Sequence, residues 1–97
     1  MSMMSRIAIK ERNRDIVATH ERLLKDLGSL DTKNLSMSMS MAICESRNAA
    51  ELRGIDGIIE HADWLLHEVE ALPPSHSNPE ITDAATHLRS LLSSITC

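Results

Sequence analysis

Aromatic residues are almost absent from this 97-residue chain, which holds one tryptophan, no phenylalanine and no tyrosine. β-Sheets favour aromatic and β-branched side chains, whereas the 42% of hydrophobic residues here are mainly Leu, Ile, Met and Ala. Only three glycines and three prolines interrupt the sequence, so few and long elements are expected. The composition therefore predicts an all-α protein built by packing helix on helix.

Cysteine is also scarce, and long apolar runs are lacking. Cys44 and Cys97 form neither a disulfide framework nor a metal-binding spacing, and Cys44, which follows an apolar run, is expected to be buried. No stretch approaches the ~20 apolar residues of a membrane span, and residues 1–8 lack the apolar core of a secretory signal. We expect a cytoplasmic protein with no membrane attachment.

Charge is unevenly distributed along the chain, whose net charge is −4. Residues 1–34 carry seven basic and five acidic side chains, whereas residues 45–97 carry three basic and nine acidic ones. A nucleic-acid-binding protein usually presents a concentrated basic face, so we do not expect one here. One alternative is kept open, a DNA-associated regulator that uses the basic part of the first helix, with residues Arg6, Lys10, Arg12 and Arg14.

A chain of 97 residues is expected to form a single domain over residues 1–97, and the helical spacing of its apolar residues places the helices. The first helix is expected over about 5–27, with Gly28 positioned to end it. His20 falls inside the apolar stripe of this helix. A second, long helix is expected over about 34–72, because a Pro-Pro pair follows it.

The last helix is expected over about 78–96, where Ser77 and Glu80 have the spacing of a capping box. The linker before it is short, so this helix should fold back on the second one as a C-terminal antiparallel hairpin. The predicted fold is a small three-helix bundle that dimerises. It becomes four-segmented if the long helix restarts near Asn48.

The segment 35–44 alternates apolar residues with serines. Such alternation is typical of a half-buried strand, but Met, Leu and Ala are strong helix formers. We favour a helix, since a strand would need a symmetry-related copy as its partner. The methionines either fill gaps in a core or offer an adaptable binding surface; they are Met37, Met39 and Met41.

Trp64 lies on the opposite side of the predicted long helix from its main apolar stripe. At 100° per residue it points roughly 160° from the centre of that stripe. Two helical glycines, which cost roughly 1 kcal/mol each relative to alanine, predict that a neighbouring backbone approaches this side closely. The second face comprises Ala50, Gly54, Gly57, His61, Trp64, Glu68 and Ala71.

Three neighbours could cover this second face: the first helix of the same chain, a second copy in a homodimer, or a foreign protein. An exposed tryptophan would be a natural anchor for a foreign protein. The predicted partner-binding residues are Trp64, His61, Gly57, Gly54, Glu68, Met37, Met39 and Met41.

No pattern of residues predicts catalysis, a metal site or a cofactor. One side of the long helix is acidic but lacks the Glu-x-x-His pairs of di-iron bundles, so a solvated acidic face is expected. Nucleophile elbows and Gly-rich phosphate loops do not occur in the sequence. The residues of the acidic face are Asp56, Glu60, Asp63, His67 and Glu70.

These observations predict a non-enzymatic protein-interaction module. The leading hypothesis is a stoichiometric regulator or inhibitor that binds and blocks a larger protein of unknown identity. An anti-CRISPR-like or anti-activator-like role fits by size and class only. The main alternative is a self-assembling structural, scaffold or chaperone-like protein that uses the same face to form oligomers.

Overall fold

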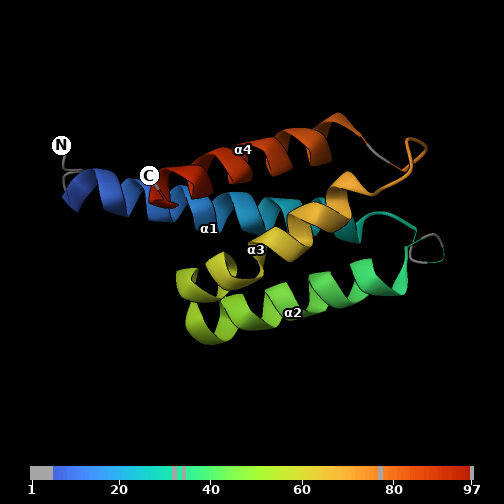
Figure 1. The fold of residues 1–97 in the computed structure, drawn as a ribbon, viewed down its shortest axis with the longest axis horizontal. Helices are drawn as coiled ribbons and strands as arrows, with labels where there is room; N and C mark the ends of the chain where they lie inside the picture. The colour runs from blue at the N-terminus through green and yellow to red at the C-terminus, as the bar shows by residue number, and fades with distance from the viewer. Residues whose placement is uncertain (1–5, 32, 34, 77, 97) are drawn as a thin grey trace.

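The chain is all-α in its computed structural model, which describes residues 6–31, 33, 35–76 and 78–96 (Figure 1). Four helices form a small bundle of 46 × 27 × 18 Å, and no strand occurs within the described ranges. None of these helices is both long and apolar enough to cross a membrane. The helices are α1 (Arg6–Gly28), α2 (Met37–Arg53), α3 (Ile55–Glu70) and α4 (Pro79–Thr96).

The Met/Ser-rich segment is helical, as the sequence favoured. Ser36 is the N-cap of α2, and its hydroxyl oxygen accepts a hydrogen bond from the Met39 amide at 3.0 Å. A serine at this position satisfies one of the amide groups left free in the first turn of a helix. This cap marks the start of α2, so the segment forms the helix that was favoured and not the strand that was considered as the alternative.

The start of α4 is capped one residue later than the predicted capping box. The Asn78 side-chain oxygen accepts a hydrogen bond from the Ile81 amide at 2.9 Å, and Pro79 occupies the first helical position, where its missing N–H costs nothing. Ser77 lies outside the described residues. The predicted helices over 5–27 and 78–96 agree with α1 and α4 to within a residue or two.

The prediction of a single helix over 34–72 is wrong, because the structure divides this segment into α2 and α3 at one residue. Gly54, with φ 58° and ψ −132°, ends α2 and begins α3. This backbone conformation is readily accessible only to glycine, and the helical ladder cannot pass through it. The chain consequently reverses at Gly54, so that α2 and α3 lie against each other as a hairpin (Figure 1). A restart at Asn48 is not seen, because α2 continues through it.

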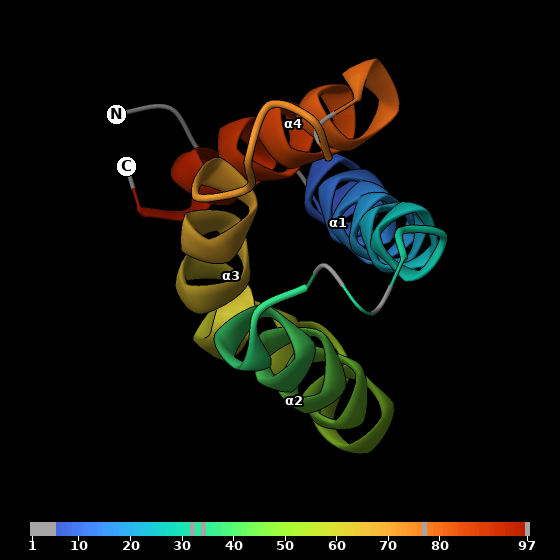
Figure 2. The ribbon, with the colours of Figure 1, turned by 90° about the vertical axis from the view of Figure 1, so that its right-hand side faces the viewer.

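Helix α3 contacts the other three helices. After the linker, α4 turns back as predicted and contacts α3, but it packs more extensively along α1 (Figures 1 and 2). The most extensive helix–helix contact is between α2 and α3. The core residues are Ile16, Leu23, Leu24, Leu27, Met39, Ala42, Ile43, Ile58, Leu65, Leu66, Ile81, Ala84 and Leu88.

Candidate interaction groove

Helix α2 packs on the middle part of the predicted second face, from Gly57 to Glu68, whereas Gly54 and Ala71 at its ends are exposed and Ala50 belongs to α2 itself. Ser38, near the start of α2, donates a hydrogen bond of 2.7 Å from its hydroxyl to a carboxylate oxygen of Glu68 on α3. At the other end of the pair, a Cβ built on Gly57 would lie 2.1 Å from the carbonyl oxygen of Ala49. We call Gly57, His61, Trp64 and Glu68 the α2-facing row, since they share one face of α3 between these two contacts.

The residues of the α2-facing row are largely enclosed within the chain. Gly57 is buried, Trp64 is half-buried against the core, and the imidazole Nδ1 of His61 lies 3.2 Å from the Gly57 carbonyl oxygen. The close backbone approach predicted from the glycines is present at Gly57, but the neighbour is α2 rather than α1, a second copy or a foreign protein. Gly54, by contrast, is exposed at the turn.

The three methionines divide between two environments. Met39 is 2% exposed and belongs to the core, whereas Met37 and Met41 lie exposed on the outer side of α2. Cys44 is exposed as well, so the expectation that it would be buried is wrong. The alternating pattern suggested that the three methionines share one surface. In a helix, however, side chains two residues apart point about 200° apart around the axis.

The acidic side of α3 is solvated, as predicted. Its five residues are exposed, and the described residues contain no cluster of three or more metal-ligating side chains. Glu60 forms an ion pair with Arg53 across the Gly54 turn. The hydrogen bonds from Arg53 lower the pKa of Glu60 and raise that of Arg53. The residues are Asp56, Glu60, Asp63, His67 and Glu70.

A groove of about 490 Å³ separates α1 from α2. These two helices run antiparallel and touch only slightly, while α3 and α4 complete the arc between them (Figures 1 and 2). The volume lies in the range of sites that bind ligands or side chains of a partner. The residues that line this α1–α2 groove are Val17, His20, Glu21, Leu24, Lys25, Arg47, Ala50, Glu51, Gly54 and Ile58.

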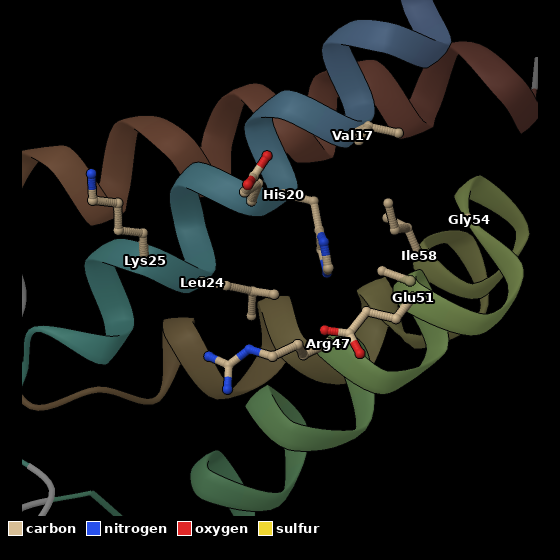
Figure 3. A pocket seen from close by; sticks show the side chains of 10 residues that line it. Val17, His20, Leu24, Lys25, Arg47, Glu51, Gly54 and Ile58 are labelled. Carbon is tan, nitrogen blue, oxygen red and sulfur yellow. The ribbon is translucent and has the colours of Figure 1, made fainter.

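His20 is the most unusual residue of the groove. It is 2% exposed, and its imidazole Nε2 is buried without a hydrogen-bond partner among the described residues. Figure 3 shows the ring pointing from α1 into the space before α2. Burial lowers its pKa from 6.5 to about 4, because removing the imidazolium from water is unfavourable. The ring is therefore neutral at pH 7, with one nitrogen unsatisfied.

Four charged side chains also line the groove. Lys25 and Arg47 lie toward the end of the groove where α1 finishes, and Glu51 lies closer to the Gly54 turn (Figure 3). Glu21 precedes Lys25 by one helical turn. None of these four forms an ion pair within the described part of the chain. The groove thus has a basic end and an acidic portion that are not neutralised internally.

The lining of the groove combines apolar surface with a few polar side chains. None of the ten lining residues carries a hydroxyl or thiol side chain. The apolar part of the surface comes from Val17, Leu24, Ala50 and Ile58. Apolar surface with a few directed polar groups is typical of a binding site.

The sequence carried one signal of this groove, the position of His20 in an apolar stripe. The contributions of Arg47 and Glu51 were not foreseen, since they depend on the reversal at Gly54 that brings α2 opposite α1. Comparisons of the chain with protein-family models, curated proteins and solved structures find no match. The geometry of the chain is therefore what bears on its function.

Proposed function

We propose that the chain is a non-enzymatic interaction module that binds an amphipathic helix of a larger protein in the α1–α2 groove. By holding that helix it would act as a stoichiometric regulator or inhibitor of its partner. The single observation that carries the proposal is the unpartnered Nε2 of His20 in this groove. Buried polar groups in folded proteins are nearly always hydrogen-bonded, so a partner that supplies the missing group gains binding free energy.

The shape of the groove supports a helix as its occupant. Its two walls are themselves antiparallel helices, α1 and α2, and α3 provides Ile58 between them. A helix laid between two others buries an apolar stripe against both. Val17, which is 43% exposed, would become covered by such a helix.

The charges of the groove support a particular partner chemistry. An acidic side chain of the bound helix would lie over Arg47, and a basic one over Glu51. Complementary charges of this kind increase association rates and reject wrong partners. We place the protein in the cytoplasm, where an anti-activator-like or anti-CRISPR-like role matches its size and class.

Site-directed photo-crosslinking in cells of the source organism identifies the partner. A photoreactive residue replaces Glu51, which lines the groove, or Glu45, an exposed glutamate of the same helix that does not line it. We expect one adduct from position 51 that is absent from position 45. Equal labelling of the same protein from both positions would contradict the groove as its binding site.

The purified partner is then titrated against two matched tryptophan variants by isothermal calorimetry. Val17→Trp fills the groove from its rim, whereas Ala18→Trp places the same side chain on the neighbouring exposed position outside it. We expect Val17→Trp to weaken binding at least tenfold and Ala18→Trp to leave it within twofold of the unmodified chain. Unchanged binding by Val17→Trp would overturn the proposal.

A further inference from the structure

The connection between α2 and α3 consists of one residue, Gly54. Its φ of 58° and ψ of −132° are what fold α2 back on α3. On both sides of it the sequence has a helical pattern, and a helical conformation at Gly54 alone would join residues 37–70 into one helix of about 51 Å. Two different arrangements of the same segments therefore depend on the two backbone angles of one residue.

Opening the hairpin would expose the α2-facing row, Gly57, His61, Trp64 and Glu68. The surface that fits this row is α2 itself, because α2 and α3 form the most extensive helix–helix contact in the chain. Helix α2 has only slight contact with α1, so α3 is its principal attachment. A second copy of the chain carries an identical α2 and could supply the same contacts.

We propose that the chain also forms a dimer in which two copies exchange α2. Residues 37–70 of each copy make one continuous helix, and α2 of each packs on the α2-facing row of the other. The hydrogen bond from Ser38 to Glu68 and the close approach of Ala49 to Gly57 are re-formed between the two chains. Short hinge connections favour exchange of this kind.

In the exchanged dimer, each α1–α2 groove is lined by residues from both copies. Val17, His20 and Lys25 would come from one copy, while Arg47 and Glu51 would come from the other. Each dimer then carries two grooves, and each groove is incomplete without the second copy.

The ion pair between Arg53 and Glu60 belongs to the closed hairpin. In a continuous helix these residues, seven apart, lie beyond the three- and four-residue spacings at which helical side chains meet. The pair therefore favours the monomer, and its screening by salt favours exchange.

The first test is a glycine substitution followed by light scattering. Gly54→Ala disfavours the positive φ of the closed hairpin and favours the continuous helix, so we expect its dimer dissociation constant to fall at least tenfold. Gly28→Ala is the matched control, since a Cβ at Gly28 meets nothing within 4 Å and its φ is not positive. A folded, monomeric Gly54→Ala chain at all concentrations would overturn the proposal.

The second test distinguishes exchange from side-by-side association and uses the otherwise unmodified hinge. Cysteines replace Ser38 and Glu68 in a Cys44→Ser, Cys97→Ser background, and a short bismaleimide joins them. We expect a covalent dimer whose fraction rises with protein concentration, beside the internally linked monomer. Only internally linked chains at every concentration would overturn the proposal, whether or not Gly54→Ala folds.

Discussion

A Cβ placed on Gly57 of α3 would lie 2.1 Å from the carbonyl oxygen of Ala49 on α2, closer than real Cβ contacts allow. The neighbouring atom is backbone, so it cannot rotate away as a flexible side chain would. Gly57 is thus the residue that lets the two helices meet, and the roughly 1 kcal/mol that glycine costs in a helix is offset by the packing it permits.

Gly57→Ala should consequently destabilise the chain, by about 3 kcal/mol in the free energy of unfolding, since overpacking outweighs the gain in helix propensity. Chemical denaturation followed by circular dichroism measures the change. Gly28→Ala, which meets no neighbour, should stay within about 0.5 kcal/mol of the unmodified chain. A Gly57→Ala chain more stable than the original would mean that α2 does not lie against this residue.

His20 should make the chain sensitive to acid. Burial holds its pKa at about 4 in the folded state, below the ordinary 6.5, so the unfolded state binds more protons between these values. Its contribution to stability is complete above pH 6.5 and is lost as the pH falls toward 4. At 1.36 kcal/mol per pKa unit, the loss from pH 7 to pH 5 is about 2 kcal/mol.

The His20→Leu variant removes this contribution and leaves the carboxylates unchanged. Urea denaturation of both proteins at pH 7 and pH 5 isolates the effect as the difference between their pH dependences. An identical loss of stability in both proteins would show that the imidazole is hydrated in the folded state.

Ser46 of α2 is completely buried, and its hydroxyl oxygen lacks a hydrogen-bond partner among the described residues. Removing an unsatisfied buried hydroxyl removes its desolvation cost. We expect Ser46→Ala to raise the free energy of unfolding by about 1 kcal/mol more than Ser40→Ala does. Ser40 is exposed on the same helix, so it corrects for the helix propensity of alanine. A thermal denaturation series in which Ser46→Ala is the less stable variant would contradict the expectation.

The methionines of α2 should differ in their effects on stability. Met39→Ala removes a core side chain that is 2% exposed and should cost about 3 kcal/mol. Met41 is 49% exposed, so Met41→Ala should cost less than about 1 kcal/mol. Denaturant midpoints of the two variants test this, and equal costs would contradict the placement of Met39 in the core.

Helices α1 and α4 were predictable because their apolar spacing and Pro79 agree with the observed boundaries. Gly28 does mark the end of α1, but it is the last helical residue and its φ is not positive, so the expected left-handed position after the helix is wrong. The break between α2 and α3 was not predictable, since glycine occurs in helices for two different reasons. Gly54 takes a positive φ and turns the chain, whereas Gly57, three residues later, stays helical and admits a neighbouring backbone. Residue type and spacing do not separate these roles.

The candidate site depended on that break. His20 stands out in the sequence as a polar residue in an apolar stripe, but its unsatisfied Nε2 results from the separation between α1 and α2. Trp64 was expected to be covered by the first helix, a second copy or a foreign protein, because a single long helix would keep residues 37–53 away from it. The reversal at Gly54 supplies that neighbour from within the chain.

The ¹⁵N resonances of the histidine side chains, recorded during titration with the purified partner, show whether the partner binds in the α1–α2 groove. We expect the Nε2 signal of His20 to shift by several ppm as it gains a hydrogen bond. The exposed His67 and His87 should keep their shifts. A saturated complex in which His20 is unchanged would contradict the α1–α2 groove as the binding site.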